Sequence, residues 1–149
     1  MKLQTSTMLA LYSVLEAASH PEKQVSAAEI AERYGVSAHH LAKVLRELGR
    51  AGILDSSRGV GGGYRFCGNA KRLTLMDVIE HFEDIGARAP EPGMAESDVG
   101  WAIVRVLTEI DDIAKATFRS ITIETLLKLV AREQQAKSPA TLPAPEQAG

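Results

Sequence analysis

Residues 58–66, RGVGGGYRF, place four glycines within five positions, between Arg58 and Arg65. A phosphate-binding loop of a nucleotide enzyme needs G-x-x-x-x-G-K-[ST], and a dinucleotide-binding loop needs G-x-G-x-x-G. Neither pattern is met, because no Lys-Ser or Lys-Thr follows the glycines and Tyr64 occupies the place of the last glycine. The residues Tyr-Arg-Phe favour a strand instead. The stretch therefore predicts a two-stranded β-hairpin, or wing, over residues 55–67 with a glycine-rich tip.

A hairpin tip of this composition suits a nucleic acid. Glycines lack Cβ atoms, so the backbone at Gly61 can approach a phosphate or enter the minor groove of DNA. Arg58, at the base of the tip, can insert into that groove, where the potential is most negative. Arg65 can meet a flanking phosphate. The alternative is a hairpin with a purely structural role.

A second group of polar residues lies on one face of a helix predicted over residues 37–50, opposite the apolar residues of that helix. This group is Ser37, His39, His40, Lys43 and Arg46. The serine and the histidines can donate to phosphates or base edges, and Lys43 can reach guanine acceptors or phosphate. Adjacent helical residues point about 100° apart, so the two histidines are a poor chelate and no metal site is predicted there.

Cys67 is the only cysteine in the chain. One cysteine excludes an intrachain disulfide and any all-cysteine metal or cluster site within one chain. Two interpretations stay open. Cys67 is either a small, half-buried residue of the second wing strand, or a redox-sensitive thiol whose oxidation beside a DNA surface would loosen binding.

The elements that position these residues follow from local signals. A helix is predicted over about 5–19, and Pro21 stops it. Ser26 and Glu29 form a capping box that opens a second helix, which ends before Gly35. Ser37 then caps the helix over 37–50. A short helix, a tight turn and a second helix in this order are typical of a helix-turn-helix.

The second half of the chain predicts a helix after Thr74, a Pro- and Gly-rich loop over 86–97, a long helix to about Arg119 and a last helix from Thr122. The long helix carries an apolar stripe that suits a second copy of the chain. The stripe residues are Val99, Ile103, Val106, Leu107, Ile110 and Ile113. We therefore expect a mainly α winged helix-turn-helix over 1–85, a linker and dimerisation helices over 86–134, and a disordered tail over 135–149.

Charge and composition narrow the class of protein. Residues 1–73 carry ten Lys/Arg and six Asp/Glu, whereas residues 74–149 carry seven and thirteen. A basic half suggests contact with a polyanion, here double-stranded DNA. No apolar run is long enough for a membrane span and no export signal is recognised, so the cytoplasm is expected. No nucleophile–base pair or paired carboxylates at a recognisable spacing indicate an enzyme.

Several motifs together resemble a family of bacterial winged-helix regulators, the Rrf-two family, which includes the iron–sulfur regulator IscR, the nitric-oxide sensor NsrR and the cysteine-metabolism regulator CymR. The matching stretches are MKLQTSTMLAL, AAEIAERYGVSAHHLAKVLRELGRAGILDSSRGVGGGYRF, LTLMDVI and SITIETLL. The resemblance covers about residues 1–130. It implies a homodimer that is joined through the long helix and binds partly palindromic operator DNA. We expect this dimer to act as a repressor or autoregulator.

The chain also departs from this family. Cluster-binding members carry three cysteines between the helix after the wing and the long helix, whereas residues 86–98 here contain neither cysteine nor histidine. Met8 stands where some relatives have another ligand, and Ala42-Lys43 replaces a frequent Glu-Gln pair. We therefore expect no cofactor and an unusual operator. The signal, a small molecule or a partner protein, stays open, as do a thiol redox sensor and a protein-interaction module without DNA binding.

Overall fold

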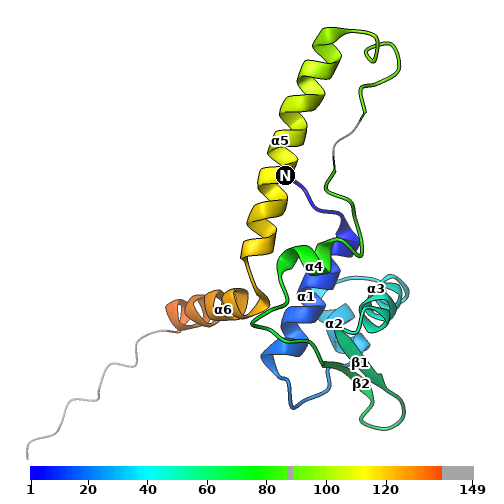
Figure 1. The fold of residues 1–149 in the computed structure, drawn as a ribbon. Helices are drawn as coiled ribbons and strands as arrows, with labels where there is room; N and C mark the ends of the chain where they lie inside the picture. The colour runs from blue at the N-terminus through cyan, green and yellow to red at the C-terminus, as the bar shows by residue number, and fades with distance from the viewer. Residues whose placement is uncertain (87–88, 139–149) are drawn as a thin grey trace, which may run out of the picture.

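The computed structural model describes residues 1–86 and 89–138, which form a mainly helical fold with one small sheet (Figure 1). In chain order the elements are α1 (Thr5–Ser19), α2 (Ala27–Tyr34), α3 (Ala38–Arg50), β1 (Leu54–Ser57), β2 (Gly63–Phe66), α4 (Leu75–Ile79), α5 (Asp98–Ser120) and α6 (Ile123–Lys137). This order confirms the predicted winged helix-turn-helix followed by a long helix. Within the described residues, no helix is long and apolar enough to cross a bilayer.

The helix-turn-helix forms as the local signals predict. The Ser26 side chain accepts from the Glu29 amide and the Glu29 side chain accepts from the Ser26 amide, which confirms the capping box. Gly35 has the left-handed φ of 62° that ends α2. Ser37 caps α3 by accepting from the amide of His40. The apolar face of α3 is buried against α1 in a single core whose largest fully buried side chains include Leu41, Leu45 and Leu48.

The hairpin after α3 is tied to the helices by backbone hydrogen bonds. Strands β1 and β2 are antiparallel, with Leu54 opposite Phe66. Beyond this pair, the Val25 amide donates to the Tyr64 carbonyl at 2.8 Å and the Tyr64 amide donates back to Val25 at 2.9 Å. The root of the wing is thereby fixed to the segment that leads into α2, so the wing keeps a set position relative to the helix-turn-helix.

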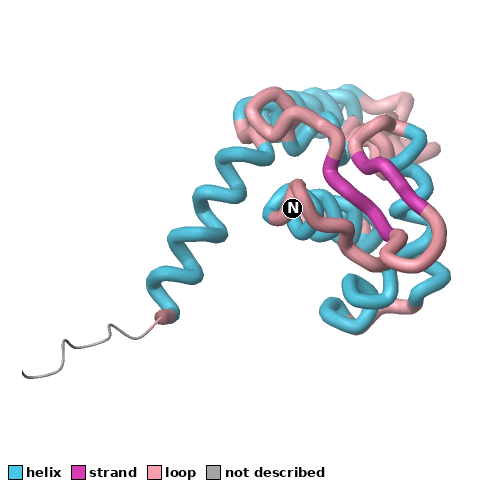
Figure 2. The backbone as a smooth tube through the Cα atoms, turned by 90° about the horizontal axis from the view of Figure 1, so that it is seen from below, coloured by secondary structure: helices cyan, strands magenta, loops and turns pink. Residues whose placement is uncertain are grey.

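The second half of the chain returns to the same core. Helix α5 projects from the body, and α6 extends in another direction from the cluster of α1 to α4 (Figures 1 and 2). Where α5 meets α6, the Leu75 amide donates to Ile121 and the Ile123 amide donates to Leu73, both at 2.9 Å. Ile123 is fully buried in the core. The predicted dimerisation segment and the DNA-binding segment therefore share one core.

One boundary of the sequence analysis is wrong. Helix α6 runs to Lys137, so residues 135–137 are helical and do not belong to the predicted disordered tail. The reason is local, because Arg132 to Lys137 are good helix formers and the first proline after them is residue 139. Residues 87–88 of the predicted loop and 139–149 of the predicted tail lie outside the described residues.

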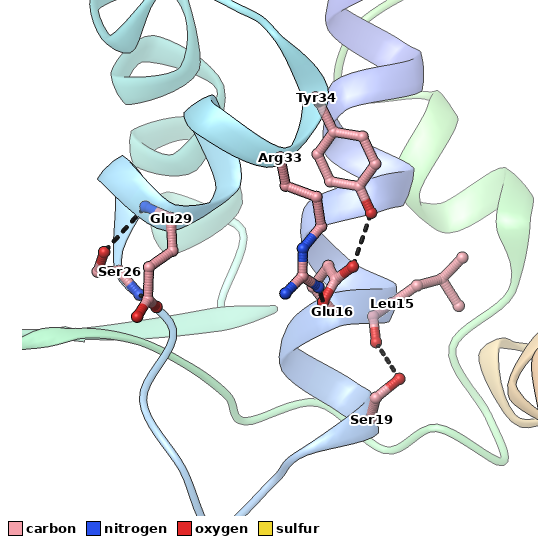
Figure 3. A network of polar contacts seen from close by, with 7 residues as sticks. All are labelled: Leu15, Glu16, Ser19, Ser26, Glu29, Arg33 and Tyr34. Atoms are coloured by element: carbon pink, nitrogen blue, oxygen red, sulfur yellow. Dashed lines mark hydrogen bonds and ion pairs between the residues drawn. The ribbon is translucent and has the colours of Figure 1, made fainter.

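A polar network joins α1 to α2 on the surface of the helix-turn-helix (Figure 3). The Tyr34 hydroxyl donates to Glu16 Oε1 at 2.7 Å, and Arg33 forms an ion pair with the other carboxylate oxygen. The Tyr34 ring stacks on Tyr12, with centroids 4.7 Å apart. Burial alone would raise the pKa of Glu16, but the hydrogen bonds from Tyr34 and Arg33 outweigh it and lower that pKa. Burial and the Glu16 hydrogen bond raise the pKa of Tyr34 to about 12.

We expect Tyr34→Phe to lower the free energy of unfolding by about 1 kcal/mol at pH 7, because the carboxylate loses one charge-assisted hydrogen bond in a partly solvated site. A carboxylate with a lowered folded pKa stabilises the fold above its unfolded pKa of about 4.3. That stabilisation disappears as pH falls through the folded pKa, so the deficit of the variant should shrink below about pH 4. Urea unfolding at several pH values measures it.

Tyr12→Phe is the matched control, since its ring can still stack on Tyr34 and its hydroxyl takes no part in the Glu16 network. We expect its free energy of unfolding to stay within about 0.5 kcal/mol of the wild type. Equal losses in the two variants, or a Tyr34→Phe deficit that is unchanged by acid, would contradict the role given to Glu16.

Candidate nucleic-acid interface

The outer face of α3 presents the polar residues that the sequence singled out. Leu41, Val44, Leu45 and Leu48 are buried, so the opposite face is turned to solvent. His39, Lys43 and Arg46 are exposed there. Ser37 is also exposed, although its Oγ already accepts a hydrogen bond from the His40 amide, with the nitrogen and oxygen 3.1 Å apart. Its hydroxyl proton is still available to an acceptor such as a phosphate oxygen.

His40 differs from the other predicted DNA-binding residues. Seven of the eight are exposed, whereas His40 is half-buried. Its Nε2 lies 2.9 Å from the hydroxyl oxygen of Ser6, on the first turn of α1. The ring is therefore directed at α1. Sequence periodicity could not show this, because it places a residue on a helix face but not against a particular neighbour.

The wing presents its charged residues on one face. Leu54 pairs with Phe66 on the face toward the core, and the next pair, Asp55 opposite Arg65, is exposed. Directly opposite charges attract across a sheet, so Asp55 reduces the positive potential that Arg65 offers. Arg58 follows β1 and is exposed with no carboxylate opposite it in the strand register.

The four glycines of the wing have two different roles. Gly59 and Gly61 have φ values of 98° and 75°, and a Cβ on either would meet nothing within 4 Å. In contrast, a Cβ on Gly62 would lie 2.6 Å from the Ser57 carbonyl oxygen, and one on Gly63 would lie 2.8 Å from that of Val25. The hairpin therefore requires all four glycines, Gly59 and Gly61 because of their positive φ and Gly62 and Gly63 because there is no room for a Cβ. Gly61 is exposed and leaves its backbone accessible at the tip.

A groove of about 530 Å³ separates α3 from the wing. Its lining includes Arg46 and Arg50 from α3, Arg58 from the wing, and Ser56 and Ser57 from β1. The lining also holds one carboxylate, Asp55. The three guanidinium groups outnumber it and, with the two hydroxyls, suit the phosphate backbone of a nucleic acid. Arg50, Ser56 and Ser57 are not among the site residues predicted from the sequence. The signal for Arg50 was present, because it follows Arg46 by one helical turn.

Cys67 lies just after β2, and its thiol is exposed. The prediction of a half-buried strand residue is therefore wrong. Its amide still donates to the Ile53 carbonyl at 3.1 Å, which continues the hairpin ladder by one bond. The thiol donates to the Gly52 carbonyl at 3.1 Å. That Cys67 acts as a redox-sensitive thiol stays a prediction.

A helix-turn-helix whose second helix is polar on its outer face, followed by a basic wing, defines a winged helix-turn-helix, a class of DNA-binding protein. The model of the Rrf2 family, described as an iron-dependent transcriptional regulator, matches residues 3–129. The chain belongs to this family.

Individual relatives agree with this assignment. A protein of Rhodopseudomonas palustris named as the HTH-type transcriptional regulator BadM is 50% identical over 91% of this chain and 86% of its own length. The structure of CymR, the global cysteine regulator of B. subtilis, is 27% identical with a TM-score of 0.70 and covers 87% of this chain and 98% of that one. T. potens IscR, at 24% identity and a TM-score of 0.70 over 93% of each chain, has the same fold. The chain is therefore a DNA-binding transcriptional regulator and not an enzyme.

The residues of this chain do not fit the iron that the family description implies. An iron–sulfur cluster needs several thiolates. The one cysteine, Cys67, lies just after β2, and its thiol donates a hydrogen bond to the Gly52 carbonyl. Among the described residues, no three His, Cys, Asp or Glu side chains gather where they could hold a metal ion. The segment over 86–98 offers neither cysteine nor histidine.

We expect the protein purified without oxygen to be colourless and to bind its DNA equally well before and after treatment with a chelator. Absorption spectroscopy with iron and sulfide assays, followed by a DNA-binding titration, measures this. Near-stoichiometric iron with matching sulfide that disappears in Cys67→Ser would contradict it, because the cysteine would then be a ligand.

Proposed function

We propose that the chain is a cytoplasmic homodimeric repressor that binds a partly palindromic operator through helix 37–50 and the wing 55–67. The observation that carries the proposal is an exposed apolar stripe on α5 in a chain that also presents a basic surface on α3 and the wing. The first feature supports self-association and the second supports DNA binding. A two-fold dimer places its two recognition helices on two half-sites of a palindrome.

The stripe is unusual for a monomer. Val99, Ile103, Val106, Leu107, Ile110 and Ile113 are each 49–69% exposed, and all project from one side of a 23-residue helix. Monomeric proteins rarely leave a continuous apolar surface of this size in water. A second copy of α5 carries the same stripe and can cover it in a self-complementary interface. Trp101, on another face of α5, is also 55% exposed, and its indole N–H donates to the Ala95 carbonyl.

On the DNA side, we assign base contacts to the first turns of α3 and phosphate contacts to the groove. His39 and Lys43 reach the major groove, and Ser37 donates to the backbone at its edge. Arg46 and Arg58 line opposite walls of the groove and neutralise phosphates. Gly61 and Arg65 bring the wing to the adjacent minor groove. An operator that overlaps a promoter excludes polymerase when it is occupied, so repression at such a site requires no further surface of the chain.

The first test is the salt dependence of binding. A duplex is selected from a random library, and its affinity is measured by fluorescence anisotropy over a salt series. We expect a steep decrease in affinity with salt, with a slope of about 0.9 per neutralised phosphate. Arg46→Ala and Arg58→Ala should each reduce that slope by about one.

Arg132→Ala is the matched control, since it removes an exposed arginine from α6, which lies away from the wing in Figures 1 and 2. Its slope should equal that of the wild type. A flat salt response, or equal changes in all three variants, would refute DNA binding through α3 and the wing.

The second test concerns the dimer. Ile110→Asp places a charge in the middle of the stripe, and burying it without a partner is costly. We expect light scattering to show a monomer, and operator binding to weaken because only one half-site is held. Ala116→Asp puts the same charge on another face of α5 and should leave the dimer intact. A wild-type monomer at working concentration would refute the interface.

A further inference from the structure

A single polar contact joins the recognition helix to α1. The Ser6 hydroxyl and His40 Nε2 are 2.9 Å apart at a partly buried site. Among the hydrogen bonds of the described residues, no other connects α1 with α3. The rest of this helix pair meets through apolar side chains, including Leu9 on α1 and Leu41 and Leu45 on α3.

The two kinds of contact constrain α3 differently. Apolar packing is non-directional, so it sets how closely α3 approaches α1 and fixes its rotation only through side-chain shape. A hydrogen bond weakens steeply when its angle departs from linearity. It therefore opposes rotation of α3 about its own axis and sliding of its first turn. The His40 amide is held by the Ser37 cap at the same turn, so both the backbone and the side chain of this residue are fixed.

We infer that His40 is a positioning residue, which sets the angle at which α3 meets the operator through its bond to Ser6, and that it does not itself read a base. Ser37, His39 and Lys43 lie on the turns that this bond orients. Either tautomer of a neutral imidazole can pair with a hydroxyl, which donates and accepts. This inference rests on the proposed function, namely that the outer face of α3 contacts DNA.

The consequence is a loss of discrimination rather than of general affinity. Phosphate contacts tolerate a small rotation of α3, whereas bidentate contacts to base edges do not. Ser6→Ala removes the bond without changing any residue of α3. Thr5→Ala removes the exposed hydroxyl one residue earlier and is the matched control. Ser6→Thr keeps the hydroxyl and is the conservative rescue.

The experiment measures, at one salt concentration, the ratio of affinities for the selected duplex and for a scrambled duplex of equal length. We expect Ser6→Ala and His40→Ala each to reduce this ratio about fivefold, the loss that one hydrogen bond implies. The double variant should lose no more than either single one. Thr5→Ala and Ser6→Thr should match the wild type, and thermal unfolding shows that all variants are folded.

Two results would overturn the inference. An unchanged ratio in Ser6→Ala would show that the bond does not orient α3. The affinity ratio could also fall further in His40→Ala than in Ser6→Ala, and the double variant could show the product of the two losses. That result would show that His40 contacts DNA directly. Neither result would contradict DNA binding by the wild type. If the wild type itself binds no duplex, DNA recognition through α3 is refuted as well, which is a separate outcome.

Discussion

The packing of α1 against the apolar face of α3 is the contact on which the rest of the structure depends. Leu9 and Val14 of α1 are buried in the same core as Leu41 and Leu45 of α3. Because Leu41 and Leu45 lie on one face of α3, the opposite face is exposed, and that face carries the residues proposed to bind DNA. Burial of the apolar residues of α3 therefore decides which of its polar residues can reach a ligand. These apolar residues are Leu41, Val44, Leu45 and Leu48.

Two sets of backbone hydrogen bonds extend this core to the functional parts. Val25 and Tyr64 exchange bonds and hold the wing, while residues 73–75 bond to 121–123 and hold the end of α5. Both pairs use backbone groups only, although the pair at Val25 also requires Gly63, where a Cβ would lie 2.8 Å from the Val25 carbonyl oxygen. In the proposed function, recognition of the DNA sequence then depends on exposed side chains such as His39 and Lys43.

Local signals were sufficient to predict the helix-turn-helix, since Ser26, Gly35 and Ser37 act on neighbours within four residues. The hairpin also followed from its glycines. Contacts between elements were not predictable in this way. The bond between His40 and Ser6 joins residues 34 positions apart. The exposure of Cys67 depends on where the ladder of β1 and β2 stops, and the groove that includes Arg50 exists only once α3 and β1 are side by side.

The segment before α5 shows how a member of this family can order this region with its own backbone. Met94 donates to the Glu91 carbonyl at 2.9 Å, and Ser97 donates to Met94 at 3.0 Å. The Ser97 hydroxyl then caps α5, and the Trp101 indole donates to Ala95 at 2.8 Å. Gly100 is buried under Met94, where a Cβ would meet the Met94 carbonyl. These hydrogen bonds give partners from the chain itself to the backbone groups at the start of α5.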